Sequence, residues 1–218
     1  MPAQRPALAG ARLLVPLAWM NVAFHAVGLA VAWLALRPGS VAVPLAERMA
    51  YLAPRPAAWS WGWGLWILCS LLLVSFMAVL RHQVPGDPIA AQLALILAAA
   101  GMAVDLLCDV IQIQVLPGAA KAGPAVFLAF EQLAFTGGLT VANGLYTCGV
   151  LLMNVSLRGA IGPMARFAGW VTAVAGFALA AAGIASSTAL LQAATVATIG
   201  GYSLWTVLVA RDLRGIQP

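Results

Sequence analysis

The sequence predicts an all-α integral membrane protein, a bundle of about six transmembrane helices. Hydrophobic residues make up 63% of its 218 residues and charged residues only 8%, whereas a soluble domain carries roughly 25% charged residues. Apolar runs follow one another along the whole chain, and the mean hydropathy is +0.98. We therefore expect a single transmembrane domain over residues 1–218.

Six runs are long enough to cross a bilayer, which takes about 20 apolar residues in a helix. They are 13–36, 59–80, 89–116, 125–155, 167–185 and 189–210. The first run is longer than the apolar core of a signal peptide, roughly 7–15 residues, so we expect an uncleaved first helix. Proline, glycine or serine marks the breaks at 85–88, 117–118, 159–163 and 186–188. Pro117 is expected to end the third helix because it cannot donate a backbone hydrogen bond.

Basic residues are scattered singly at the ends of the apolar runs. This pattern sets membrane topology, so we expect no nucleic-acid partner despite the net charge of +5. The two tails and the second and fourth loops lie on one side of the membrane and hold Arg5, Arg12, Arg81, Arg158, Arg166, Arg211 and Arg214. The loops on the other side hold Arg37, Arg48, Arg55 and Lys121. The excess on the first side predicts that both termini are cytoplasmic. The bias toward Ala, Gly, Arg and Val indicates a bacterial protein, which would lie in the inner (plasma) membrane.

The first outer loop predicts a short interfacial helix. Leu45, Met49 and Leu52 fall on one helical face, which suits a helix lying in the membrane surface. A tryptophan cluster follows at Trp59, Trp61, Trp63 and Trp66. Indoles favour the headgroup boundary, so this cluster is expected to anchor the outer end of the second helix. The alternative is stacking against a substrate.

The most specific signal lies on one face of the third span. Asp105, Asp109 and Gln112 fall within about 60° of one another at 100° per residue. Two carboxylates one turn apart repel each other when both are ionised. Charged groups inside a span are costly and usually mark function. The competing interpretation is a pair of neutral acids that donate hydrogen bonds between helices.

Other polar residues occur in the first, fourth and sixth spans. Asn21 and His25 share one face of the first span. They either bind a ligand or form hydrogen bonds between helices. Glu131 points either into the bundle or toward the outer headgroups. The remaining candidates are Gln132 and Asn143 on a stripe with Thr136 and Thr147, and Gln192 and Tyr202 on the sixth span. Gly137-Gly138 and Gly200-Gly201 permit close helix approach or loosen the helix around a site.

The predicted spans hold three acids, Asp105, Asp109 and Glu131, and neither Lys nor Arg. His25 is therefore the expected basic partner. Buried carboxylates without a counter-ion must be protonated, hydrated or bound to a cation. Each of these outcomes favours a polar, acid-lined cavity, and the depths of the acids favour an opening to the outer side.

Several chemistries are excluded. The two histidines lie at different depths, which rules out a bis-histidine haem, and no His or Cys cluster suits zinc. Cys69, Cys108 and Cys148 lie in apolar runs and predict no disulfide framework. No motif of a serine hydrolase, zinc protease or nucleotide-binding loop occurs. We expect no cofactor and no metal.

The second half of the chain carries several short motifs: Leu151-Leu152 through Arg158, Gly162-Pro163, Arg166, Gly169-Trp170, and Leu204-Trp205 before Arg211. In these motifs it resembles the C-terminal part of small bacterial multi-pass proteins that are grouped as a domain of unknown function. The resemblance covers less than half of the chain, and it implies no functional residue.

Three functions remain open. The first is a transporter or binding protein for a proton, a cation or a cationic small molecule, with Asp105 and Asp109 as ligands. Six helices could form two inverted triplets, as in some transporters, although no internal sequence repeat supports this. The second is an intramembrane enzyme that uses acid–base chemistry on a lipid or isoprenoid. The third is a structural subunit of a homo-oligomer or a membrane complex. All three place the chain in a lipid bilayer.

Overall fold

A computed structural model describes residues 9–82, 88–185 and 187–214. These ranges contain no β-strand, and they hold six helical spans that are long and apolar enough to cross a membrane. The spans are Leu13–Gly39, Ala57–Arg81, Pro88–Ala122, Pro124–Ser156, Pro163–Ala185 and Thr188–Arg214. Each predicted run lies inside one of them, which confirms the prediction of an all-helical chain with six candidate spans.

Three of the spans are composite helices that each contain a short π-helical segment, and the other three are single α-helices. The elements in order are α1 (Ala9–Val31), η1 (Ala32–Leu36), η2 (Arg37–Gly39), α2 (Leu45–Leu52), α3 (Ala57–Arg81), α4 (Pro88–Val110), η3 (Ile111–Val115), α5 (Leu116–Ala122), α6 (Pro124–Phe135), η4 (Thr136–Ala142), α7 (Asn143–Ser156), α8 (Pro163–Ala185) and α9 (Thr188–Arg214). Segments η1, η3 and η4 are π-helical, and η2 is a 3₁₀ turn.

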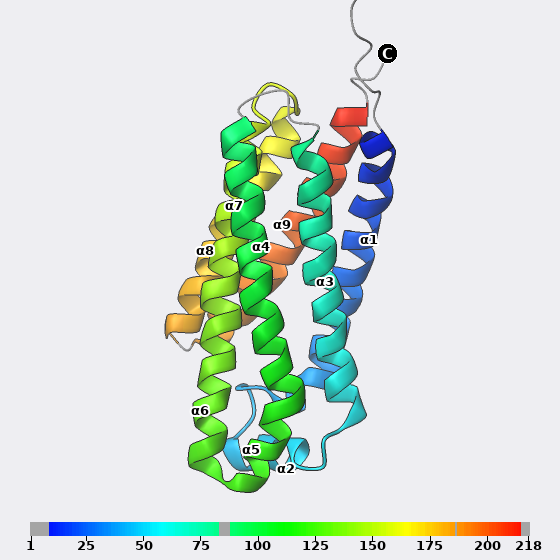
Figure 1. Cartoon of the computed structure of the whole chain (residues 1–218). Coiled ribbons are helices and arrows are strands. Elements are labelled where there is room, and N and C mark those ends of the chain that lie inside the picture. The colour runs from blue at the N-terminus through cyan, green and yellow to red at the C-terminus, as the bar shows by residue number, and fades with distance from the viewer. Residues whose placement is uncertain (1–8, 83–87, 186, 215–218) are drawn as a thin grey trace, which may run out of the picture.

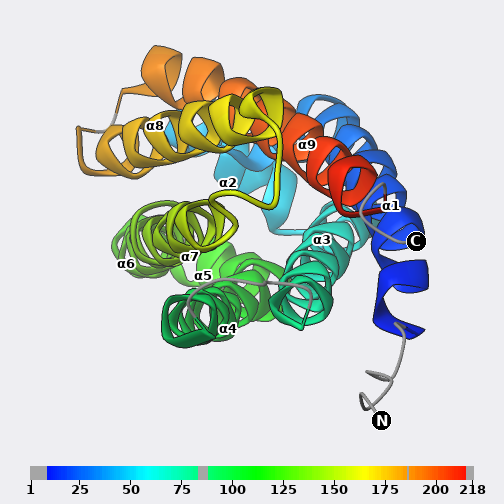
Figure 2. The ribbon, with the colours of Figure 1, turned by 90° about the horizontal axis from the view of Figure 1, so that it is seen from above.

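The spans form a ring. Helices consecutive in the chain pack side by side, and α9 packs against α1, which closes the ring (Figure 2). The start of α1 and the end of α9 lie at the same end of the bundle (Figure 1). Helices α2 and α5 lie at the opposite end, and α2 is visible through the ring in Figure 2. The end with the start of α1 is the terminal end, and the end with α2 and α5 is the α2 end.

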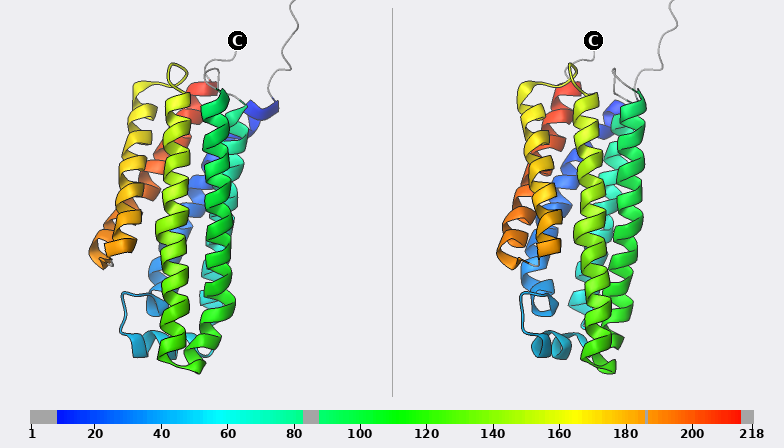
Figure 3. Two further views of the ribbon diagram at one scale, coloured as in Figure 1. Left: turned by 60° about the vertical axis from the view of Figure 1, so that its left-hand side comes forward. Right: turned by 90° about the vertical axis from the view of Figure 1, so that its left-hand side faces the viewer.

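The hairpin of α8 and α9 is shorter than the spans beside it. Figure 3 shows its tip stopping short of the α2 end. The α8 span has 23 residues, compared with 35 and 33 for the spans that contain α4 and α6. Near the α2 end the ring is therefore bounded mainly by the other spans.

The third helix does not end at Pro117, contrary to the prediction. The chain stays helical to Ala122, because Pro117 follows the π-helical segment η3 and the carbonyl five residues before it, Gln112 O, accepts a hydrogen bond from Trp59 Nε1 instead. The chain turns instead at Gly123, whose φ of +123° favours glycine. Between α7 and α8 the predicted break is confirmed. Residues 85–87 and Ser186, which belong to two further predicted breaks, lie outside the described residues, as does Arg5.

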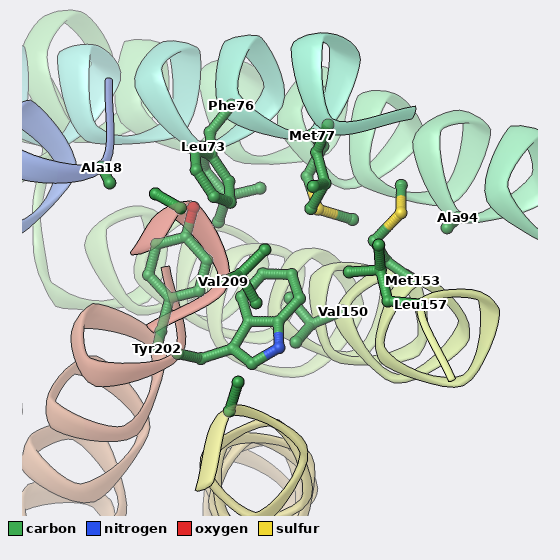
Figure 4. Packing of buried hydrophobic residues seen from close by; sticks show 14 of the residues in the cluster. Ala18, Leu73, Phe76, Met77, Ala94, Val150, Met153, Leu157, Tyr202 and Val209 are labelled. Carbon is green, nitrogen blue, oxygen red and sulfur yellow. The ribbon is translucent and has the colours of Figure 1, made fainter. Parts of the chain in front are cut away.

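An apolar cluster fills the ring toward the terminal end. Trp205 is fully buried at its centre, with its ring 6.0 Å from that of Phe76. Figure 4 shows the side chains of α3, α7 and α9 converging there, including Met77, Met153 and Val209. This cluster packs the interior of the ring around Trp205, and some of its members, such as Leu73 and Val150, also line the cavity described below.

Candidate functional site

A cavity of about 350 Å³ lies inside the ring, and all six spans contribute to its walls. It extends from the buried acids of α4 to the loop at Ser40–Ala42 and the start of α9 at Thr188. Most of its walls are apolar or aromatic. The polar residues nominated from the sequence that line it are His25, Asp105, Asp109, Gln112, Glu131, Asn143, Gln192 and Tyr202.

Asp105 is held by hydroxyl groups from two neighbouring helices. Its Oδ2 accepts hydrogen bonds from Ser70 Oγ of α3 at 2.5 Å and from Tyr146 Oη of α7 at 3.2 Å. Asp105 lies at the midpoint of a span of 35 residues. The two donors fix the carboxylate at the cavity wall.

Asp109 and Gln112 present acceptor atoms that have no donor. Asp109 is 1% exposed, yet no described residue donates to its Oδ2. Gln112 is also buried, and its Oε1 likewise lacks a partner in the described part of the chain. Buried acceptors normally have a hydrogen-bond partner, and an unpaired one costs about 1–3 kcal/mol. Trp63 Nε1, a buried donor on the same wall, also lacks a partner among the described residues. These unpaired groups indicate that the cavity takes a polar occupant that can donate to Asp109 and Gln112.

The π-helical segments all border the cavity. Residues of η1, η3 and η4 appear among its lining, and π-helical turns inside α-helices occur frequently at functional sites. In η4, a Cβ on Gly137 would lie 2.5 Å from Cys108 Sγ, so the glycine allows η4 to approach α4 beside the acids. Asn143 Nδ2 donates to the Gly138 carbonyl at 3.0 Å, which satisfies part of the widened turn.

The second glycine pair behaves differently. A Cβ on Gly201 would lie 2.9 Å from Thr172 Oγ1, whereas Gly200 faces open space. Close approach of α8 and α9 therefore explains Gly201 alone. Both residues belong to the regular helix α9.

Asn21 and His25 have separate roles. Asn21 is fully buried outside the cavity lining, donates to Leu72 O of α3, and accepts from Tyr202 Oη of α9 at 3.1 Å. It therefore ties three helices together. His25 lines the cavity, and its Nδ1 lies 2.8 Å from Asn21 O. Since a carbonyl only accepts, Nδ1 must carry the proton of that bond.

Glu131 has a basic partner that the sequence analysis missed. Arg48 of α2 forms an ion pair with Glu131, with Nε 2.7 Å from Oε1. The sequence predicted His25 as the basic partner of the three acids. That prediction was wrong for Glu131, whose partner is Arg48. Asp105 and Asp109 take part in no ion pair with any residue in the described ranges. Two carboxylates thus remain without a cationic partner.

The tryptophans of α3 divide between two faces. Trp59, Trp63 and Trp66 line the cavity, because residues four and three apart share one helical face. Trp61 is 80% exposed on the outside. Three of the four tryptophans thus face inward, and of this cluster only Trp61 has the outward position that the predicted interfacial anchor requires. Trp59 Nε1 donates to the Gln112 backbone carbonyl at 2.7 Å, which fixes its indole beside the acidic face.

The remaining candidates split as well. Gln132 is exposed, bonds to Thr136 and does not line the cavity. Asn143, Gln192 and Tyr202 do line it. Two contributors, Ser70 and Tyr146, were missed by the sequence analysis. Tyr146 is next to the polar stripe of Asn143 and Thr147 in the sequence, and this position is the feature from which its role could have been predicted. Nothing in the sequence singles out Ser70.

Within the described residues, no group of three His, Cys, Asp or Glu side chains is placed to hold a metal ion. Comparisons with protein-family models, with curated proteins and with solved structures each gave no match. The cavity offers two carboxylates, unpaired acceptor atoms and an aromatic wall.

Proposed function

We propose that this protein binds a cation in the cavity at Asp105 and Asp109, and that the cation exchanges with a proton during transport across the membrane. The observation that carries the proposal is the placement of both carboxylates on one cavity wall without an ion pair to any described residue. A buried carboxylate in this state must hold a proton, water or a cation. One site that accepts either a proton or a cation is the minimum requirement for coupling their movements.

The proposed topology places both termini in the cytoplasm of a bacterium, with the α2 end on the outer side of its plasma membrane. The seven-to-four distribution of Lys and Arg supports this orientation. Helix α2 would then lie at the outer interface, and the cavity would open outward. The apolar cluster around Trp205 would separate the cavity from the cytoplasm.

The proposed function is tested with dicyclohexylcarbodiimide, an apolar reagent that adds to protonated carboxyl groups in membranes. We expect mass spectrometry of the treated protein in lipid nanodiscs to locate the adduct on Asp105 or Asp109. A cation that occupies the site should slow the labelling, and the cations tested are sodium, potassium and phenethylammonium. Asp105→Asn and Asp109→Asn should each remove the adduct at the replaced residue.

Glu47→Gln is the matched control, because it removes an exposed carboxylate of α2 outside the cavity. It should leave both labelling and protection unchanged. Absence of any adduct at Asp105 and Asp109, or labelling that none of the three cations slows, would refute the proposed function.

A further inference from the structure

We infer that the ligand is a protonated organic amine that carries N–H groups and an apolar body. This inference rests on the proposed function and names the class of cation that the cavity takes. It separates this class from quaternary ammonium compounds, which have no N–H, and from bare inorganic ions. Three independent features of the cavity support it.

The first feature is the pair of unpaired acceptors. Asp109 Oδ2 and Gln112 Oε1 are buried, and each lacks a donor in the described part of the chain. An ammonium group carries up to three N–H donors, so it can satisfy both atoms and neutralise the carboxylate at once. Hydrogen bonds between charged groups are among the stronger ones in proteins. A quaternary ammonium group leaves both acceptors unsatisfied.

The second feature is the aromatic wall. Trp59, Trp63 and Trp66 line the cavity from α3, and Tyr146 and Tyr202 line it from α7 and α9. Aromatic faces attract cations within about 6 Å and also pack against apolar groups. An inorganic ion retains a hydration shell or takes about six oxygen ligands, and indole rings supply none. The wall therefore suits an organic cation.

The third feature is the size and polarity of the cavity. Its volume of about 350 Å³ falls in the range of small-molecule pockets. Aliphatic side chains also line the cavity, among them Leu29, Leu73, Val150, Leu179, Val196 and Ile199. An apolar body would displace water from these side chains. The polar groups would then fix the orientation of the ammonium head.

The inferred entry side is the α2 end. Thr188 and Gln192, at the start of α9, line the cavity and are exposed, and Arg37 of η2 also lines it. The Arg37 guanidinium is placed over the Trp33 ring, 5.2 Å from its centre. The guanidinium is occupied by this cation–π contact and forms no ion pair with either acid of α4 among the described residues. An entering amine therefore meets aromatic and amide groups before it reaches Asp109.

The test is calorimetric titration of the full chain in lipid nanodiscs, with empty nanodiscs as the blank. The probes are phenethylamine and hexylamine, the N,N,N-trimethyl analogue of each, and phenethyl alcohol as the neutral counterpart. We expect saturable binding of both primary amines and at least about tenfold weaker binding of the trimethyl analogues, because two charge-assisted hydrogen bonds are lost. The alcohol should not bind. This comparison uses the unmodified chain, so it does not depend on the folding of a variant.

Binding to variants then shows which residues contact the ammonium group. Asp109→Asn should weaken binding of phenethylamine at least about tenfold and Gln112→Leu by less, while Glu47→Gln should leave it unchanged. Trimethyl analogues that bind as tightly as the primary amines would overturn the inference. If no amine binds while sodium or potassium slows carbodiimide labelling, the proposed cation site stands and the amine is the wrong ligand. If neither amines nor inorganic cations act at the site, both proposals fail.

Discussion

Arg48 and Glu131 are 83 positions apart in the chain and meet through two hydrogen bonds, Nε to Oε1 at 2.7 Å and Nη2 to Oε2 at 2.8 Å. The third guanidinium nitrogen donates to Val43 O at 2.8 Å. This paired geometry is the one in which Arg binds a carboxylate best. It fastens α2 to α6 across the α2 end of the ring.

Breaking this ion pair from one side should destabilise the protein. The side chains of Arg48 and Glu131 are only 12% and 10% exposed, and removal of one partner leaves the other charge buried and unpaired. We expect Glu131→Gln or Arg48→Met to lower the free energy of unfolding by up to about 3 kcal/mol, measured as a fall in Tm in detergent. The double variant with Met at both positions should recover most of the loss. A double variant less stable than either single one would contradict this account.

Glycine at position 149 should be irreplaceable, because two backbones approach each other there. A Cβ on Gly149 would lie 2.9 Å from Ala94 O and 3.3 Å from Ala98 N, both in α4. A backbone cannot rotate away as a side chain can, so Gly149→Ala should cost about 1–3 kcal/mol. Gly144, five residues earlier in α7, faces open space. Gly144→Ala should therefore be neutral or slightly stabilising in the same thermal assay. Equal Tm values for the two variants would disprove the close approach.

Asn21 should contribute to stability and not to ligand binding. Its amide bonds to α3 and α9, and it does not line the cavity. Asn21→Leu should reduce stability by about 1 kcal/mol, since interhelical hydrogen bonds in membranes contribute roughly 0.6–1.7 kcal/mol each. Tyr202→Phe removes one of the same bonds, so the double variant should lose less than the sum of the two single losses. A strict sum would show that the hydroxyl and the amide act independently.

The mouth of the cavity should be accessible to water from the outer side. Gln192 is exposed and lines the cavity, whereas the nearby Leu190 is exposed and lies outside the lining. In a chain whose own cysteines are replaced, we expect Gln192→Cys to react with a membrane-impermeant thiosulfonate added to intact cells. Leu190→Cys should react far more slowly, because a thiol in lipid stays protonated and unreactive. Reaction of Gln192→Cys only in inverted vesicles would reverse the proposed orientation.

Much of the candidate site could be predicted from periodicity within one helix. The spacing of Asp105, Asp109 and Gln112 predicts that they share one helical face, and the structure puts all three on the cavity wall. Helical geometry fixes such relationships locally. The same rule, applied to Trp59, Trp63 and Trp66, shows that they share a face. It does not say whether that face turns to lipid or to the interior.

What the sequence by itself determined is the number and approximate extent of the helical spans, because run length and hydropathy are properties of the chain read in one dimension. What only the tertiary structure decided is which distant groups meet. The pairing of Glu131 with Arg48, the inward turn of three tryptophans and the contact of α9 with α1 all depend on how helices pack. Packing depends on side-chain shape at every crossing, and no local pattern encodes it. It also leaves Asp105 and Asp109 together on one wall without an ion-pair partner among the described residues.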